Sequence, residues 1–408
     1  MTTPSVVSSP EGAPASRPLP AVIHLLSLSI FAMATSEFMV AGMMPSLATA
    51  FGVSLAEVGK LVSAFAASVV VGGPLLTLRL RAARRKPALL GLLAVFLIGQ
   101  LIGATAGGYP QLLASRIVCG VAQSAFFGVA LALAGELVGA ASIARAAGLV
   151  LNGLMLASVA GLPLATLLDR QWGWRPAFWL VAALVGLAML GIAALAPPGA
   201  KPARQDAGDE LRALARPPLW AAYLSSGLII GAVFAVFTYL APIFVEIGGF
   251  SGATVPLLFG VYGAATVLGN LVTGRLADRH ARHVLLGGTL TLVLVMSALA
   301  LGAQWQALTV AGVALLGLAG LPMNPAMVAR VVRARGSGPM VNSLHMAVVN
   351  LGLMFGSWAG GAGLDAGLGL RAPLWLGALL ALLALLSLSL DAGGYSWRIT
   401  GNSPGRPR

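Results

Sequence analysis

Charged residues are scarce in this chain, and their scarcity excludes a water-soluble fold. Of its 408 residues, 9% are Asp, Glu, Lys or Arg, whereas 58% are hydrophobic, and the mean hydropathy is +0.91. A soluble globular domain carries roughly 25% charged residues. The composition therefore predicts a protein whose helices or strands lie in a lipid bilayer.

Cysteine and the residue clusters of common enzyme sites are also missing. The single cysteine, Cys119, has no second thiol with which to form an internal disulfide. The chain has no glycine-rich phosphate loop with its lysine, no His/Cys/Asp cluster at metal-ligand spacing, and neither G-x-S-x-G nor H-E-x-x-H. We therefore expect no ATP-driven step, no metal or other cofactor, and no enzyme of these classes.

Long apolar runs occupy most of the sequence. A transmembrane helix needs about 20 mostly apolar residues, and twelve runs approach that length. The sequence thus predicts an all-α membrane protein with twelve transmembrane helices. The predicted spans are residues 20–44, 55–78, 87–105, 110–133, 146–168, 176–196, 218–242, 254–274, 284–303, 306–328, 339–363 and 373–390.

Positive charge gathers in alternate loops between these runs. With the N-terminus placed in the cytoplasm, 20 of the 25 Lys and Arg residues lie in inner segments, four in outer loops, and one, Arg116, inside a span. This bias follows the positive-inside rule and predicts that both termini are cytoplasmic. The net charge of +13 then lies next to anionic lipid headgroups, so a nucleic-acid partner is not expected.

The spans divide into two groups of six. Residues 1–19 and 391–408 are expected to be cytoplasmic tails, the first rich in Ser, Pro, Ala and Thr and therefore disordered, and 197–217 a cytoplasmic linker. The predicted halves are 20–196 and 218–390. Basic loops follow the second span of each half, at 81–85 and 279–283. Two fused helical halves are typical of transporters whose binding site alternates in access between them.

The second of these loops resembles a known motif. Gly274, Asp278, Arg279 and Arg282 stand in a stretch similar to the G-x-L-x-D-R-x-G-R-K loop of the major facilitator superfamily. In that family the acidic residue holds helices together at the inner mouth. The first copy departs from the motif, because Leu80 stands where the Asp would be, so this contact is expected in the second half alone.

Three further stretches resemble one subgroup of that superfamily, the drug:proton antiporters that include chloramphenicol exporters and arabinose or sugar efflux proteins. They lie at 35–45, at 161–179 and at 350–356, and 114–120 is similar to the fourth-helix motif of the superfamily. The resemblance implies export of a small neutral or amphipathic compound, such as a phenicol, in exchange for protons. Sugar or metabolite efflux is one alternative, and uniport is another. A membrane enzyme or receptor would need clustered catalytic groups or an output domain, and neither is found.

Glu37 is the only acid deep within a predicted span. A lone carboxylate there costs about 2.5–3.5 kcal/mol on insertion scales, which suits a group that loads and releases protons. The alternative is a static carboxylate tied to Arg116, or to the hydroxyls of Thr35 and Ser36. Arg116 is the only base inside a span. The resemblance implies that it tunes the protonation of Glu37, and its alternative role is to donate hydrogen bonds to neighbouring helices.

Gly161 and Pro163 lie in the middle of the fifth span. Proline removes a backbone hydrogen bond and bends a helix, while glycine lets a neighbour approach. The resemblance implies a hinge and a close contact at this point. The alternative is an ordinary kink of a membrane helix.

Polar residues recur on one face of span eight and within an arc of span eleven. Each set is a candidate lining of a substrate cavity, and each is equally a candidate for hydrogen bonds between helices. We expect small-molecule cargo, protons and the bilayer as partners, and a functional monomer in a bacterial inner membrane. The candidate residues are Tyr262, Thr266, Asn270, Asn342, His345 and Asn350.

Overall fold

The computed structural model describes residues 19–80, 83–138, 142–197, 217–334 and 339–390. Within these ranges every regular element is helical. Twelve helices there are long and apolar enough to cross a membrane. Each coincides with a predicted span, with ends that differ by a few residues. The predicted fold class is therefore confirmed, because the bilayer thickness that sets the length of an apolar run also sets the length of a helix. The expected tails and most of the expected linker lie outside the described residues.

The N-terminal half contains the first six spans. Its elements are α1 (Ala21–Gly42), α2 (Met44–Phe51), α3 (Leu55–Leu80), α4 (Arg85–Ala104), α5 (Tyr109–Glu136), α6 (Ile143–Leu156), η2 (Ala157–Gly161), α7 (Leu162–Trp172) and α8 (Arg175–Leu195).

The C-terminal half contains the other six. Its elements are α10 (Pro217–Phe237), α11 (Leu240–Pro242), η3 (Ile243–Ile247), α12 (Val255–Gly302), α13 (Gln306–Ala319), η4 (Leu321–Met323), α14 (Asn324–Arg333), α15 (Pro339–Asp365) and α16 (Ala372–Leu390).

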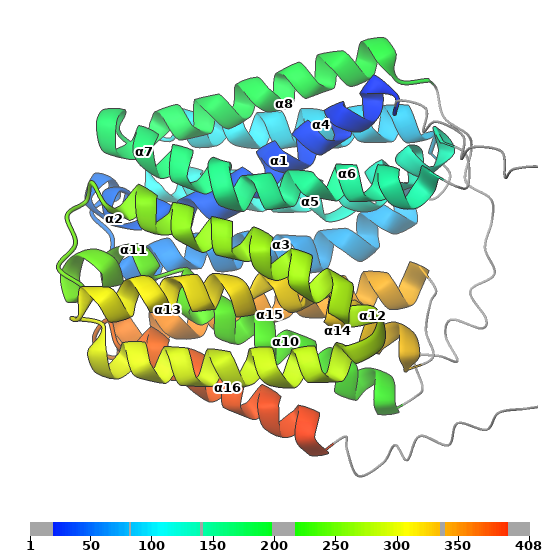
Figure 1. Ribbon diagram of the computed structural model, residues 1–408. Coiled ribbons are helices and arrows are strands. Elements are labelled where there is room, and N and C mark those ends of the chain that lie inside the picture. Colours follow the sequence, from blue (N-terminus) through cyan, green and yellow to red (C-terminus); the bar gives the residue numbers. More distant parts are fainter. Residues whose placement is uncertain (1–18, 81–82, 139–141, 198–216, 335–338, 391–408) are drawn as a thin grey trace, which may run out of the picture.

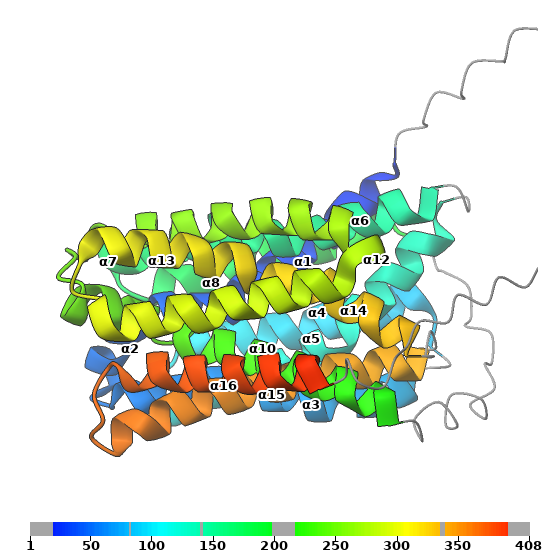
Figure 2. The ribbon, with the colours of Figure 1, turned by 60° about the horizontal axis from the view of Figure 1, so that its bottom comes forward.

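The helices run side by side and define two ends of one bundle. The start of α1, the end of α8, the start of α10 and the end of α16 lie together at one end, on the right in Figure 1. We call this the terminal end. The short helices α2 and α11 lie at the other end, which we call the opposite end. Figure 2 shows the same arrangement after rotation, with α16 and α15 brought forward.

Several predicted spans are not simple α-helices. The fifth span contains the π-helical turn η2, where the Leu162 N–H donates to the carbonyl of Ala157. Pro163 follows, and since it has no N–H to donate, the hydrogen-bond ladder is already interrupted at this point. The element α12 comprises two helices, spans eight and nine, that meet at a kink where His280 leaves helical geometry (φ −128°, ψ 31°). The structure thus agrees with the sequence on the interruption near Pro163 and on separate helices on either side of His280.

Glycines allow the helices to approach closely. A Cβ placed on Gly352 would overlap the backbone of Gly227, and one on Gly356 would overlap that of Gly231, which brings α15 directly against α10. In lipid, helix association depends on such close van der Waals packing rather than on hydrophobic burial. Gly352, Gly356 and their partners thus allow α15 and α10 to pack in direct backbone contact.

Candidate functional site

The carboxyl group of Glu37 makes one side-chain hydrogen bond, to a residue on another helix. Glu37 is half-buried on α1, and Nε2 of Gln123 on α5 donates to its Oε2 at 2.6 Å. A carboxylate that accepts a single neutral hydrogen bond in a membrane interior is poorly stabilised as an anion. Its environment therefore suits proton binding better than permanent ionisation.

Arg116 lies on the same helix as Gln123, fully buried. Its Nη1 donates to Oγ of Ser36 at 2.9 Å, and its guanidinium carbon lies 4.4 Å from the centre of the Phe65 ring. Ser36 also accepts a hydrogen bond from Nε2 of Gln100 on α4. Nε and Nη2 of Arg116 have no hydrogen-bond partner among the described residues. Arg116 therefore donates a hydrogen bond to a neighbouring helix. The same contact holds its positive charge at Ser36, which directly precedes Glu37.

Two arrangements left open by the sequence can now be compared with the contacts. The ion pairs among the described residues do not include Glu37, and its hydrogen bond goes to Gln123 rather than to Arg116, Thr35 or Ser36. Sequence reasoning missed both glutamines. Gln123 follows Arg116 by seven residues, two helical turns, and so lies on the same face of α5. That spacing is the sequence signal from which Gln123 could have been found.

The contact of the first span with the fifth is built on small residues. A Cβ at Gly161 would overlap the Thr35 hydroxyl, and one at Gly42 would overlap that of Thr166. Gly161 ends the π-helical turn and Pro163 lies in the first turn of α7. Both residues therefore lie where α1 packs against the interrupted fifth span, and Gly161 contacts Thr35, two residues before Glu37.

The polar residues of span eight have different surroundings. Oγ1 of Thr273 donates to the Pro322 carbonyl of span ten at 2.6 Å. The Tyr262 ring instead packs on Phe237 of α10, with ring centres 5.2 Å apart, and its buried hydroxyl has no partner among the described residues. Oγ1 of Thr266 donates to the Tyr262 carbonyl of its own helix at 2.9 Å, and Asn270 is half-buried. Contact with span ten thus accounts for Thr273 but not for the Tyr262 side chain.

The candidates on span eleven have contacts of their own. His345 is buried and stacks on Tyr223 of α10, with ring centres 5.8 Å apart. Asn350 donates to the Met346 carbonyl of its own helix, and Asn342 is exposed. The side-chain contacts of Tyr262 and His345 therefore differ, with Phe237 and Tyr223 respectively, and a shared cavity for the six candidates stays a prediction.

The motif loop lies around the bend of α12. Gly274, Arg279 and Arg282 are exposed. Asp278 is part of α12, but its side chain lies outside the described part of the structure. Nη2 of Arg333, at the end of α14, donates to the Ala277 carbonyl at 3.4 Å. Span ten thus contacts the motif directly beside Asp278.

Toward the opposite end the two halves are in contact. Phe38 of α1 and Phe237 of α10 meet with ring centres 5.8 Å apart, and a Cβ at Gly361 of α15 would lie 3.3 Å from Cα of Ala56 on α3. Nζ of Lys60 lies 3.9 Å from Asp365 across the same boundary. Aromatic and backbone contacts therefore close the boundary between the halves at this end.

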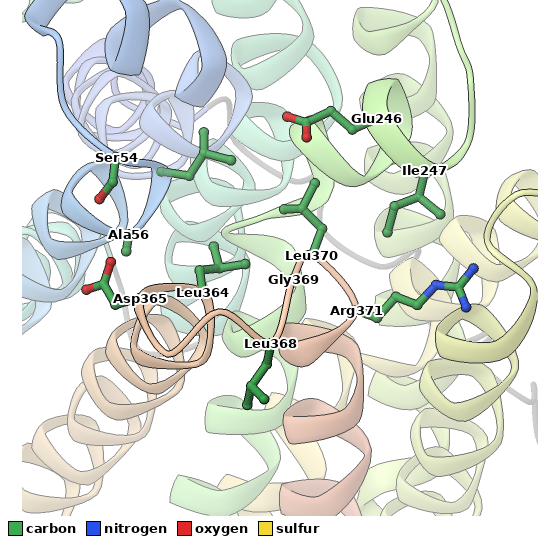
Figure 3. A pocket seen from close by; sticks show the side chains of 11 residues that line it. Ser54, Ala56, Glu246, Ile247, Leu364, Asp365, Leu368, Gly369, Leu370 and Arg371 are labelled. Carbon is green, nitrogen blue, oxygen red and sulfur yellow. The ribbon is translucent and has the colours of Figure 1, made fainter.

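A surface depression of about 590 Å³ lies outside this closed contact. Residues 54–56 of the N-terminal half and the segment that joins α15 to α16 line it. Figure 3 shows Glu246 and Asp365 on different sides of the depression and the Arg371 side chain pointing away from it. Arg371 donates instead to Oε1 of Gln304 at 3.0 Å.

Toward the terminal end the facing surface of α1 is uncovered. His24, Leu28 and Phe31 recur at helical spacing on the side of α1 that reaches Phe38. With Ser27, Leu156 and Ala160 they line a groove of about 380 Å³. Beyond this groove, a Cβ at Gly263 of α12 would overlap the Ser158 carbonyl of η2. The boundary between the halves is therefore closed toward the opposite end and uncovered at α1 toward the terminal end.

Comparison with known proteins identifies the family to which this fold belongs. The Major Facilitator Superfamily profile matches residues 26–265 and 249–403. The chain is 34% identical over 368 residues to the inner membrane transport protein YdhP of Escherichia coli strain K12, covering 90% of this chain and 95% of that one. It is 34% identical over 373 residues to a chloramphenicol resistance protein of Streptomyces lividans, with the same coverage.

The chain is also similar to a more distant transporter and, in fold, to a solved transporter structure. A probable sugar efflux transporter of Helicobacter pylori is 30% identical over 263 residues, covering 64% of this chain and 66% of that one. The crystal structure of a bacterial homologue of the human lysosomal transporter Spinster, inward-facing and occupied, superposes with a TM-score of 0.70 at 17% identity, covering 93% of this chain and 98% of that one. The chain belongs to the major facilitator superfamily and is a multi-pass secondary transporter of the membrane, not an enzyme.

Proposed function

We propose that this transporter exports a small neutral or amphipathic compound, such as a phenicol, in exchange for protons that bind Glu37. The contact between Glu37 and Gln123 carries the proposal. It gives a half-buried carboxyl group one neutral partner, and such a group changes protonation without breaking an ion pair. An intramembrane acid of this kind is usually functional.

Two observations support cargo of this type. Apart from Glu37 and Arg116, the described middle parts of the spans carry no charged side chain, so an ionic cargo would find little counter-charge. The groove along α1 offers apolar walls with one imidazole and one hydroxyl, from His24 and Ser27. The similarity to a chloramphenicol resistance protein favours a phenicol. The similarity to a probable sugar efflux transporter supports sugar or metabolite export as the second candidate.

The orientation follows from the charge bias of the loops. Inner segments rich in Arg place both termini in the cytoplasm, so the terminal end faces the cytoplasm and the uncovered groove along α1 is an inward opening. Alternating access would then proceed by rocking of the two halves around the helix contacts near Phe38. We place the protein in a bacterial inner membrane as a functional monomer.

Proton release by vesicles tests the coupling. In everted vesicles that contain the full chain, adding chloramphenicol should release protons, detected by a pH-sensitive dye. Glu37→Gln should abolish the release, because the carboxamide keeps the shape and cannot titrate. The matched control is Glu246→Gln, at an exposed carboxylate outside the spans, which should behave like the unmodified protein. Full proton release by Glu37→Gln would show that the coupling does not run through Glu37, and no release by the unmodified protein would leave uniport, with a structural Glu37, as the better account.

A susceptibility screen identifies the cargo class. Cells without their own exporters that produce this protein should tolerate phenicols better than cells with the Glu37→Gln variant. Uptake of labelled pentoses and other small sugars should be the same in both strains. Reduced sugar accumulation with unchanged phenicol susceptibility would select the sugar-efflux alternative.

A further inference from the structure

Gln123 is buried, and its amide oxygen makes no hydrogen bond among the described residues. Nε2 donates to Oε2 of Glu37 at 2.6 Å, whereas Oε1 has no partner among the described residues. A primary amide carries two donor hydrogens and two acceptor lone pairs. A buried amide oxygen without a partner costs free energy, so its persistence beside a group that changes protonation calls for an explanation.

The two protonation states of a carboxyl group need opposite partners. An ionised carboxylate only accepts hydrogen bonds, and a protonated carboxyl group also donates one. The terminal torsion of glutamine is broad and nearly two-fold, so rotation of the amide exchanges Nε2 and Oε1 at almost no change in shape. One side chain thereby satisfies both states of Glu37. Arg116 cannot, because a guanidinium has no acceptor.

The backbone of α5 holds Gln123 at a fixed distance from α1. One turn before it, a Cβ at Gly120 would overlap the Phe65 carbonyl of α3, so α5 lies directly on that helix. Two turns before it, Arg116 donates to Ser36 of α1. These two contacts position the stretch of α5 that presents Gln123 to Glu37.

Arg116, which donates to Ser36 beside Glu37, is the charged group in the middle part of the helices packed around α1, within the part of the chain that the structure describes. The others on those helices lie nearer the helix ends. They are Glu57, Lys60 and Arg79 on α3, Glu136 on α5, Arg145 on α6, Asp169 and Arg170 on α7 and Arg175 on α8, and the charged residues of α12 start at Arg275. Of the uncharged titratable groups, Tyr262 of α12 packs on Phe237, Cys119 of α5 contacts Gln100, and Tyr109 of α5 donates to the Glu57 carbonyl.

We propose that Gln123 is a positioning residue for proton exchange at Glu37, in which its amide N–H supports the ionised carboxylate and its amide oxygen supports the protonated form. This inference rests on the proposed proton antiport. In this account Gln123, a neutral side chain on α5, sets the pH range in which Glu37 exchanges its proton.

The pH profile of transport tests this role. Chloramphenicol transport would be measured in proteoliposomes of the full chain between about pH 5.5 and 9. Gln123→Met has a similar length and no hydrogen-bonding group for a carboxyl, so the ionised form of Glu37 loses more than the protonated form. The midpoint of the profile should move upward by about one pH unit or more. Gln111→Met, at the first turn of the same helix, is the control and should keep the midpoint of the unmodified protein.

Two further variants separate positioning from folding. Gln123→Asn keeps the amide but withdraws it by one methylene, so it should shift the midpoint less and in the same direction. In a Glu37→Gln background, Gln123→Met should leave the pH profile of chloramphenicol exchange unchanged. A midpoint that stays at the unmodified value in both single variants overturns the inference, even if the transport rate falls. If Glu37→Gln itself retains proton release, the proposed antiport fails instead.

Discussion

The ring of Tyr239, in the C-terminal half, occupies the space that any side chain at Gly59 of the N-terminal half would need. A Cβ on Gly59 would overlap the Tyr239 hydroxyl, and one on Gly361 would lie 2.7 Å from it. The hydroxyl donates to the Ser357 carbonyl at 2.8 Å, and Tyr239 is fully buried. One side chain thus fills the contact between α3 and α15 where the boundary between the halves is closed.

We therefore expect Gly59→Ala to open the opposite end. The added methyl group and Tyr239 cannot occupy the same space, and such overpacking costs about 1–3 kcal/mol, which the protein avoids by separating the halves there. In a Cys119→Ala background, Ala56→Cys should become more reactive toward a membrane-impermeant maleimide. Gly91→Ala, on a glycine with no atom near its Cβ position, is the control.

Removing the Tyr239 hydroxyl should partly reverse this effect. The hydroxyl oxygen is the atom nearest the Gly59 Cβ position, with the ring carbon that bears it at 2.9 Å. Gly59→Ala with Tyr239→Phe should therefore label less than Gly59→Ala alone. Equal labelling of Gly59→Ala and Gly91→Ala would show that Tyr239 does not hold this end closed.

Arg116→Lys should impair transport although it keeps the charge. The guanidinium bonds to Ser36 with one nitrogen while its plane lies near the Phe65 ring, and an ammonium group cannot reproduce this geometry. Loss of one hydrogen bond to a charged group, about 1.5 kcal/mol, corresponds to a roughly tenfold lower rate. The rate of chloramphenicol efflux, compared between the variant and the unmodified protein at equal protein amounts, measures this loss. Rates equal to those of the unmodified protein would make Arg116 a point charge alone.

Asparagine substitutions at Asp278 and at Leu80, at the two basic loops, should have different effects on the conformational balance of the transporter. Arg333 already donates to the carbonyl of Ala277, next to Asp278, whereas Leu80 offers no charge at the matching place in the first half. Asp278→Asn should weaken the inner contact by about 1–3 kcal/mol and shift the balance between the inward-facing and outward-facing states. Leu80→Asn should have little effect. Cysteine labelling from both sides of the membrane reports the balance, and identical patterns for the two variants would reduce Asp278 to a solvated charge.

The sequence was sufficient for the twelve spans, because the bilayer thickness sets the length of an apolar run. It also singled out Glu37 and Arg116, because charge inside a span is rare, and their role in proton coupling stays a prediction. It was insufficient for Gln123, Gln100 and Tyr239. Neutral amides and tyrosines occur in membrane helices for many reasons, and their roles depend on which helices become neighbours. The polar face of span eight was recognised from its spacing, but only packing shows that Thr273 contacts span ten while Tyr262 packs on Phe237 of α10.

The kink at His280 shows what charge alone can predict. The basic residues on both sides of it predicted a break between spans eight and nine, and the structure has two helices that meet there. Charge indicated where the chain leaves the membrane, as the positive-inside rule describes, but it did not indicate that one residue, His280, would leave helical geometry.

The most direct test of proton coupling compares net transport with exchange in the same proteoliposomes. The unmodified protein should accumulate chloramphenicol against its gradient when a pH gradient is imposed, and should also exchange labelled for unlabelled chloramphenicol without one. Glu37→Gln should retain exchange and lose accumulation, because the variant binds cargo but carries no proton. Accumulation by Glu37→Gln at the unmodified rate would contradict the account.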